Sequence, residues 1–276
     1  MVTSAPQTAQ SPRVPAETLA LLRGVSTATL CTQLRKRGFR SLFMHNVGPL
    51  RADLRLVGQA VTLRYIPVRE DLDTTGDFDN LSNKQRLVVE MVGPGDVLVI
   101  DARGDTRAAV LGNILAARIG SRGAAGIVTD GAFRDSPTIK TLELPTYASG
   151  QNANLSNLIH FPSEINVPIA CGGVAVLPGD VVVGDAEGII VIPRALADEV
   201  ARDAAAQEDC ESFIFDKVRA GSTIVGVYPP NEQTLREYEQ ARAGRIASRQ
   251  CLPAIHHAAG GPDEDHRGED LSRARQ

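Results

Sequence analysis

Residues Val97 to Asp135 have the sequence VLVIDARGDTRAAVLGNILAARIGSRGAAGIVTDGAFRD. Two short apolar runs, Val97–Asp101 and Ala125–Thr129, flank a stretch with helical periodicity from about Ala109 to Ser121. This order predicts a βαβ unit with two parallel strands, followed by a turn over DGAFRD. The loops after the two strands then open at the same edge of the sheet, where ligands of open α/β folds usually bind.

The loops that follow the two predicted strands carry polar residues suited to binding. The residues near the start of the helix are Gly112, Asn113, Ile114 and Leu115. Unpaired backbone N–H groups and the helix dipole favour an anion there. Beyond the second strand, Arg134 can hold a carboxylate through two hydrogen bonds, and Asp135 can ligate a hard divalent cation. The pair predicts a pocket for a small carboxylate and a metal ion; a surface ion pair beside a tight Asp130-Gly131 turn is the alternative.

Three motifs together resemble one known family. They are G-x(3)-A at Gly112–Ala116, RGAAGIVTDGAFRD at Arg122–Asp135, and LPGDVVVGDAEGIIVIP at Leu177–Pro193. The sequence resembles the RraA-like family over roughly Glu17 to Tyr228. That family includes 4-hydroxy-4-methyl-2-oxoglutarate aldolases, which often decarboxylate oxaloacetate as well, and the bacterial regulator of ribonuclease E activity.

The resemblance implies both a fold and a chemistry. The implied fold is α/β, a swivelling β/β/α-type sandwich with a central βαβ unit and flanking N- and C-terminal helices. The implied reaction is retro-aldol cleavage of a small-molecule 2-oxo acid, in which Asp135 holds Mg²⁺ or Mn²⁺ and Arg134 orients the pyruvyl end together with the N–H groups of Ile114 and Leu115. In the family, a glutamate from the long C-terminal helix of a neighbouring subunit completes the outer shell of the metal. Glu208 is the best match and Glu211 the second, so a homo-oligomer is expected, either a trimer or a dimer of trimers.

One residue departs from the aldolase pattern. Asn113 stands where the aldolases carry an acidic residue, and a neutral amide weakens the metal's outer shell and cannot act as a base. Three hypotheses therefore stay open: a divalent-metal lyase of 2-oxo acids, a non-catalytic regulator that binds an RNA-processing enzyme, and a metal-dependent dehydratase or hydrolase of sugar acids. The loop residues Arg103, Asp105 and Arg107 suit the last of these, because their charge would lie beside the pocket.

Composition excludes several other classes. The 276 residues carry a formal net charge of −4, only 4% aromatic residues and no Trp. This argues against nucleic-acid binding, which favours a basic face and stacking aromatic side chains. No run approaches the roughly 18 apolar residues of a membrane-spanning helix, so a cytoplasmic protein without a membrane anchor is expected. The four cysteines are far apart in the sequence and are expected to be free thiols.

The rest of the chain is assigned from local patterns. Residues 1–15 are expected to be disordered, residues 16–228 to form the family domain, and residues 229–276 to be an extension that is largely disordered after about residue 252. Within the domain the patterns predict helices over 16–37 and 194–221. Ser26 is expected to cap the second part of the helix over 16–37. They predict strands over 56–66, 144–148, 167–176, 180–184 and 188–192, a bulge at Gly58 and a short helix capped by Ser136. His160 is expected in a loop, with a structural role rather than a metal-binding one.

Overall fold

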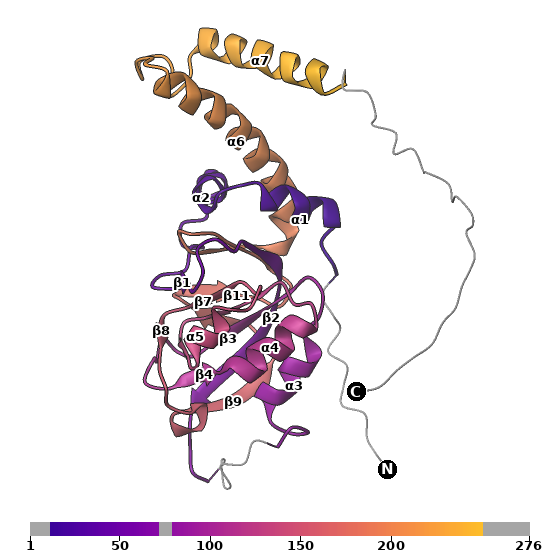
Figure 1. The fold of residues 1–276 in the computed structure, drawn as a ribbon, viewed down its shortest axis with the longest axis vertical. Helices are drawn as coiled ribbons and strands as arrows, with labels where there is room; N and C mark the ends of the chain where they lie inside the picture. Colours follow the sequence, from indigo (N-terminus) through magenta and orange to yellow (C-terminus); the bar gives the residue numbers. More distant parts are fainter. Residues whose placement is uncertain (1–11, 72–78, 251–276) are drawn as a thin grey trace, which may run out of the picture. The chain divides into compact units, whose positions relative to one another are not determined.

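The predicted βαβ unit lies at the centre of an eight-stranded mixed sheet (Figure 1). The computed structural model describes residues 12–71 and 79–250. Strand β3 (Asp96–Asp101) pairs in parallel with β5 (Gly126–Thr129), and helix α4 (Asn113–Ser121) connects them. The strand order is β1-β7-β5-β3-β2-β12-β13, with β9 also paired to β2. The other strands are β1 (Gly48–Pro49), β2 (Leu56–Pro67), β7 (Thr146–Ala148), β9 (His160–Ile165), β12 (Val181–Gly184) and β13 (Ile189–Ile192).

Alternation along β2 shows how the layers pack. Leu63 and Val57 lie on one face of the strand, which the helices cover. Leu63 packs with residues of α3 (Lys84–Met91), α4 and α5 (Ser136–Ile139). Val57 packs with residues of α1 (Ala16–Arg23), α2 (Thr27–Lys36) and the first part of α6 (Ala197–Arg219). Leu56 and Ala60 point to the opposite face, because successive side chains of a strand alternate. That face is covered by a hairpin of β10 (Ile169–Cys171) and β11 (Val174–Val176). The result is the expected β/β/α layering, with flanking N- and C-terminal helices (Figure 1).

A second small sheet lies beyond the carboxyl ends of the central strands. It joins β4 (Ala109–Leu111), β6 (Ala132–Phe133) and β8 (Gly150–Gln151) in parallel. Each follows one strand of the main sheet along the chain: β4 follows β3, β6 follows β5 and β8 follows β7. The loops that leave these short strands therefore emerge side by side.

Several expected local features are wrong. The helix predicted from about Ala109 begins at Asn113, because Ala109–Leu111 is a fully buried strand that pairs with β6. Gly58 is in regular register with Val182 rather than in a bulge; an added Cβ there would lie 2.7 Å from the Gly95 carbonyl oxygen, so glycine permits a close approach.

Three further expectations need correction. The run 167–176 is a hairpin turned at Gly172-Gly173, both with positive φ, and not one strand. Asp135, not Ser136, occupies the N-cap position of the short helix α5. Within the predicted DGAFRD turn, Ala132–Phe133 forms strand β6, because its backbone pairs with both β4 and β8.

The N-terminal helices follow the prediction closely. The expected helix is split into α1 and α2, and the Ser26 hydroxyl accepts a hydrogen bond from the Thr29 N–H at 3.1 Å, as an N-cap does. Helix α6 is preceded by a short 3₁₀ turn, η2 (Arg194–Leu196). Cys31, Cys171 and Cys210 are free, as expected, and Cys251 lies outside the described residues.

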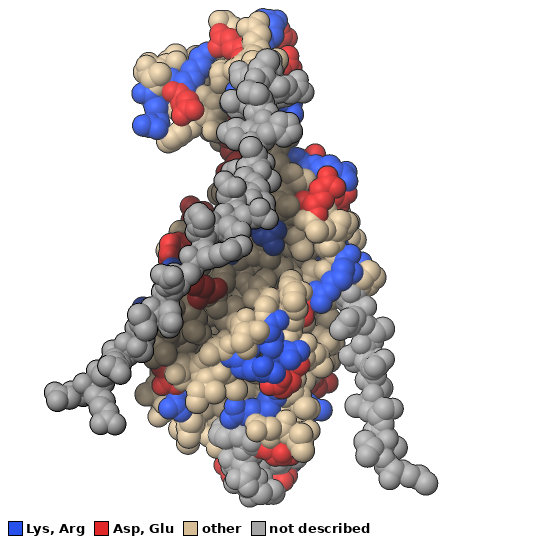
Figure 2. Space-filling view, turned by 45° about the vertical axis from the view of Figure 1, so that its right-hand side comes forward, with Lys and Arg blue, Asp and Glu red and all other residues tan. Residues whose placement is uncertain are grey.

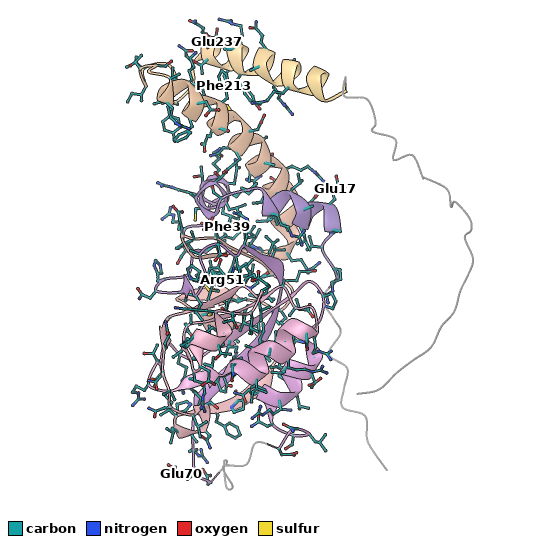
Figure 3. All side chains as sticks on the ribbon, in the orientation of Figure 1. Glu17, Phe39, Arg51, Glu70, Phe213 and Glu237 are labelled. Carbon is teal, nitrogen blue, oxygen red and sulfur yellow. The ribbon has the colours of Figure 1, made fainter. Side chains whose placement is uncertain are left out.

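By their internal contacts the residues form two compact units, 1–212 and 213–276. In the second unit, the end of α6 contacts α7 (Glu232–Gln250), which the sequence patterns did not predict. The rings of Phe213 and Tyr238 lie 5.9 Å apart, and Lys217 forms an ion pair with Glu237 (Figure 3). The predicted domain limits of 16–228 remain predictions. Of the residues expected to be disordered, 1–11 and 251–276 lie outside the described ones. The expectation is wrong for residues 12–15, where Arg13 forms an ion pair with Asp96 and the Val14 N–H donates to Gln59 Oε1 at 2.9 Å. No helix among the described residues is long and apolar enough to cross a membrane.

Candidate functional site

The small parallel sheet brings the two predicted loops together. β4 and β6 are neighbours, with Leu111 opposite Phe133, and each strand ends one residue before a residue of the predicted site. Gly112 follows Leu111, and Arg134 follows Phe133. The Arg134 N–H donates to the Leu111 carbonyl oxygen at 3.1 Å, which ties the start of α4 to the Arg134-Asp135 pair.

Gly112 allows this close approach. A Cβ added at Gly112 would lie 2.6 Å from Asp135 Oδ2 and 2.8 Å from Arg134 Cγ. The backbone of Asp135 adopts φ 55°, a left-handed conformation that a non-glycine residue seldom takes. The Asp135 carbonyl oxygen accepts from the N–H groups of Thr138 and Ile139, so helix α5 anchors this conformation.

A cavity of about 340 Å³ opens at this place. All six residues predicted for the pocket line it: Gly112, Asn113, Ile114, Leu115, Arg134 and Asp135. Its other walls come from parts of the chain that sequence patterns did not connect with the site. They are Gln85 and Arg86 from α3, Ala109 and Leu111 from β4, and Leu155 and Ser156 at the 3₁₀ turn η1 (Ser156–Leu158).

The cavity contains donors that lack an acceptor. Arg134 Nε is buried and has no hydrogen-bond partner among the described residues, although Asp135 Oδ2 lies 3.4 Å away. Helix α4 begins at Gly112 without a capping side chain, which leaves its first N–H groups open to an anion. A buried donor without a partner is costly, so a carboxylate that enters the cavity would gain both contacts.

Asp135 suits a weakly held divalent cation. Its side chain is 37% exposed and borders the cavity. Mg²⁺ commonly keeps several waters and takes only one or two protein carboxylates, so this donor set fits such an ion. Among the described residues of one chain, no three His, Cys, Asp or Glu side chains are grouped as metal ligands. An ion at Asp135 would thus depend on water, substrate or a residue from another chain.

A buried polar network supports the wall formed by β4 and α3. The Tyr65 hydroxyl and Gln85 Nε2 both donate to the Val110 carbonyl oxygen, at 3.1 and 2.5 Å. Gln85 Nε2 also donates to the Tyr65 hydroxyl at 3.0 Å. Burial raises the pKa of Tyr65, so its phenol stays protonated and holds the strand in place.

Glu208 lies elsewhere in its own chain. It is on α6, where Glu208 Oε2 accepts from the Ser26 hydroxyl at 3.3 Å, and it does not line the Arg134 cavity. Its expected role concerns the site of a neighbouring subunit, and it stays a prediction.

The charged loop residues do not lie in the predicted pocket. Arg103, Asp105 and Arg107 line a separate cavity of about 400 Å³ with Pro67, Val68 and Ile159. The expectation that they lie beside the Arg134 pocket and select its substrate stays a prediction.

His160 borders this region from strand β9, not from a loop as expected. Its Nε2 lies 3.3 Å from the Ala108 carbonyl oxygen and its Nδ1 3.2 Å from Arg103 Nη2. Both ring nitrogens thus have protein partners, which fits a structural role. Burial lowers the pKa of His160.

Positive and negative side chains are interspersed over the face that Figure 2 presents. One such group joins α4 to α3, where Arg118 and Arg122 both pair with Glu90, at 2.7 and 3.4 Å. The expectation that the chain does not bind nucleic acid stays a prediction.

Comparison with known proteins establishes the family. A family profile described as "RraA-like: Aldolase/RraA" matches residues 27–191, more than half of the chain. The chain belongs to the RraA-like family.

Relatives within the RraA-like family carry an aldolase name. A protein of Halalkalibacterium halodurans is 36% identical over 178 residues, covering 63% of this chain and 79% of that protein. A protein of Ectopseudomonas mendocina is 38% identical over 109 residues, covering 40% of this chain and 67% of that protein. Both are named "Putative 4-hydroxy-4-methyl-2-oxoglutarate aldolase".

Solved structures share the RraA-like fold. Streptomyces coelicolor RraAS2, described as an unusual member of the RNase ES inhibitor RraA protein family, is 35% identical with a TM-score of 0.67, covering 74% of this chain and 98% of that one. An uncharacterized protein of Pseudomonas syringae pv. tomato is 25% identical with a TM-score of 0.69, covering 79% of this chain and all of that one.

Proposed function

We propose that this RraA-like protein is a divalent-metal-dependent lyase that cleaves a 4-hydroxy-2-oxo acid to pyruvate, with oxaloacetate decarboxylation as a side activity. The observation that carries the proposal is the shared cavity of Arg134, Asp135 and the uncapped start of α4. The aldolase names of the two relatives support it.

The residues of the cavity have complementary parts in this reaction. Arg134 would hold the carboxylate of the pyruvyl end, and the N–H groups of Ile114 and Leu115 would fix its orientation. In the reaction the C3–C4 bond breaks, the hydroxyl on C4 loses its proton to become a carbonyl, and the electron pair passes to the enolate of pyruvate. Arg134 and the helix start then stabilise the negative charge that develops on the enolate oxygen.

Asp135 would hold Mg²⁺ or Mn²⁺. Such an ion supplies electron withdrawal from the 2-oxo group and the substrate carboxylate. Loss of carbon dioxide from oxaloacetate leaves the same enolate, so the same cavity residues serve both reactions. Asn113 adds no charge in this cavity, which predicts weaker metal binding than an acidic residue would provide.

We also propose a homo-oligomer, a trimer or a dimer of trimers, in which Glu208 of a neighbouring subunit completes the metal site. Two apolar side chains at the cavity support this, because Ile114 is 78% exposed and Leu155 is 45% exposed in the single chain. A neighbouring subunit would cover them.

A regulator that binds an RNA-processing enzyme is the second candidate. The description of Streptomyces coelicolor RraAS2 favours it. The sugar-acid reaction is weaker, because the arginines that suggested it line another cavity.

Pyruvate release tests the proposal. Wild type, Arg134→Ala and the control Arg118→Ala would be incubated with 4-hydroxy-4-methyl-2-oxoglutarate or oxaloacetate, in the presence of Mg²⁺, Mn²⁺ or EDTA. We expect metal-dependent release that falls about 100-fold in Arg134→Ala, since a charge-stabilising donor is lost. Arg118 lies on α4 outside the cavity and pairs with Glu90, so its replacement should have no effect. A folded oligomer that releases no pyruvate with any metal would exclude this lyase and favour the regulator.

A further inference from the structure

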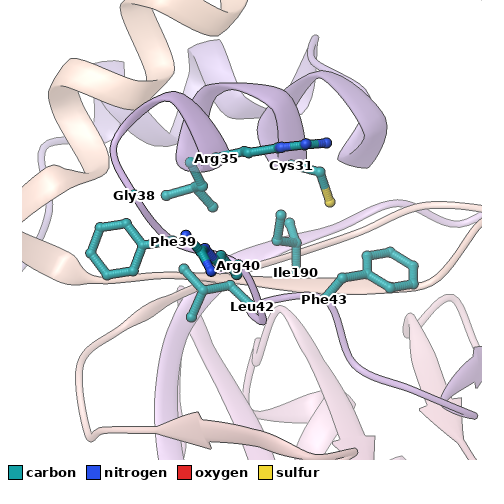
Figure 4. A pocket seen from close by; sticks show the side chains of 9 residues that line it. Cys31, Arg35, Gly38, Phe39, Arg40, Leu42, Phe43 and Ile190 are labelled. Carbon is teal, nitrogen blue, oxygen red and sulfur yellow. The ribbon is translucent and has the colours of Figure 1, made fainter.

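A larger cavity lies between α2 and β13, at the edge of the central sheet. Its volume is about 610 Å³, within the range of small-molecule sites. The cavity is lined by Cys31, Leu34, Arg35, Gly38, Phe39, Arg40, Leu42, Phe43 and Ile190 (Figure 4). None of these residues lines the Arg134 cavity.

Apolar side chains dominate this cavity. Leu34 and Ile190 are buried, while Leu42 and both phenylalanines are only partly covered by the rest of the chain. Phe39 lies beneath α2 in Figure 3. An apolar group that fills the space would remove these partly covered side chains from water.

Two cations at the cavity have no counter-charge. Among the described residues, Arg35 and Arg40 have no ion pair or side-chain hydrogen bond, in contrast to the neighbouring Arg37, which pairs with Glu199 and Asp203. Guanidinium groups bind carboxylates through paired hydrogen bonds. The cavity therefore combines an apolar interior with two available anion-binding groups.

The two arginines enter the cavity at different places. In Figure 4, Arg40 lies between Phe39 and Leu42, whereas the guanidinium of Arg35 extends toward Cys31. Burial, with the negative charges of Glu187 and Asp185, raises the pKa of Cys31, so this thiol stays uncharged. An amphipathic ligand would place its anionic end at one of the two arginines and its apolar part against Phe39, Leu42 and Phe43.

We propose that this cavity binds an amphipathic carboxylate, an apolar chain or ring with one anionic end. The site is separate from the proposed lyase cavity, and the inference does not depend on the reaction proposed there.

Binding of straight-chain carboxylates to the full chain tests this inference. Hexanoate, octanoate and decanoate would be titrated by calorimetry, with 1-octanol and octylammonium as uncharged and cationic controls. We expect one saturable site per chain and about fourfold tighter binding for each buried methylene. Octanoate should bind at least fivefold more tightly than 1-octanol, and octylammonium should not bind.

A double variant separates the role of charge from that of apolar contact. Arg35→Gln with Arg40→Gln should weaken octanoate binding about tenfold and leave 1-octanol binding unchanged. Arg23→Gln changes an exposed arginine of α1 outside the cavity and should have no effect. Because the substitutions are at exposed positions, folding should be preserved. Pyruvate release serves as an independent readout and should not change.

Cysteine labelling locates the ligand. Octanoate should slow N-ethylmaleimide alkylation of Cys31, measured by peptide mass spectrometry, without slowing that of Cys210 on α6. Equal octanoate affinity in the double variant, or unchanged Cys31 alkylation, would overturn the proposal. Absence of binding, with the double variant altering the oligomeric state, would also overturn it and assign the groove to a second copy of the chain.

Discussion

Arg134 and Asp135 occupy positions that depend on a missing side chain at Gly112. The Cγ atom of Arg134 and the carboxylate of Asp135 fill the space where a Cβ at Gly112 would stand. The left-handed backbone of Asp135 is a second constraint, because φ 55° sets the direction in which its carboxylate points. The carbonyl oxygen of the same residue accepts the first hydrogen bonds of α5. Both functional groups are thus positioned by backbone geometry as much as by their own chemistry.

Gly112→Ala should damage the site more than the fold. The added methyl group must displace Asp135 Oδ2 or Arg134 Cγ, which would lie 2.6 and 2.8 Å away. We expect at least a tenfold loss of pyruvate release and about 1–3 kcal/mol lower free energy of unfolding. Steady-state kinetics and urea unfolding would measure the two effects.

Gly120→Ala is the matched control on the same helix. Its added Cβ would make only ordinary contact with Leu144, at 3.7 Å. Alanine favours helix, so we expect a stability gain of about 0.5–1 kcal/mol and unchanged activity. Equal activity of Gly112→Ala and Gly120→Ala would contradict the positioning role of Gly112.

At the scale of elements, α3 supplies one wall of the cavity although it lies far from the motifs in sequence. The Asn83 side chain caps it by accepting from the N–H groups of Gln85, at 2.9 Å, and Arg86, at 3.4 Å. The two capped residues are also the ones that line the cavity. The start of this helix therefore links local stability to the shape of the site.

Asn83→Ala should lower both stability and substrate binding. Loss of an N-cap costs about 1 kcal/mol, which corresponds to a decrease of about 2–4 °C in melting temperature for a chain of this size. We expect a higher KM for the 2-oxo acid with a smaller effect on kcat. Asn83→Asp keeps a capping acceptor and should behave like wild type in thermal melts and kinetics; a decrease equal to that of alanine would argue against the cap.

At the scale of the whole molecule, buried ionisable groups make stability depend on pH. Burial lowers the pKa of His160, so the folded chain keeps this imidazole neutral at pH values where the unfolded chain has begun to protonate it. Burial raises the pKa of Asp130 and of Asp180, which acts in the opposite direction at lower pH. The region just below pH 6.5 therefore reports on His160.

The unfolding free energy should fall as pH decreases below about 6.5, the usual pKa of an unfolded histidine. The unfolded chain binds a proton there that the folded chain does not, so the slope is at most about 1.4 kcal/mol per pH unit. His160→Gln should remove this slope, while His45→Gln, at an exposed position, should keep it. Urea unfolding at pH 5.5, 6.5 and 7.5 would measure it, and an unchanged slope in His160→Gln would assign the effect to other groups.

A site shared between subunits of the proposed oligomer can be tested by complementation between two inactive variants. Arg134→Ala and Glu208→Gln should each lose activity, but chains co-expressed with different tags and purified as mixed oligomers should regain it. In random 1:1 mixing about one quarter of all sites, and about one third of the sites in purified mixed trimers, would combine an intact Arg134 with an intact Glu208 from the neighbour. Light scattering would establish the number of subunits. Mixed oligomers with no more activity than the parents would refute a site shared between subunits.

The central unit and the order of its site residues could be predicted because their signals are local. Apolar runs at 97–101 and 125–129 and the helical spacing after Gly112 are properties of neighbouring residues, and β3, α4 and β5 follow them. The short strand β4 could not be predicted, because three apolar residues directly before a helix share its periodicity. Only pairing with β6, distant in sequence, makes them a strand.

Local sequence patterns were enough to assign the α/β class, the family and the residues that meet at the edge of the sheet, since parallel strands joined by a helix end at the same edge. The other segments that complete the cavity are known only from the folded chain. The tertiary structure placed Gln85 and Ser156 in the walls and assigned Arg103 and Arg107 to another cavity. The physical reason is that packing joins segments with no periodic relation along the chain, so no local pattern encodes which of them meet.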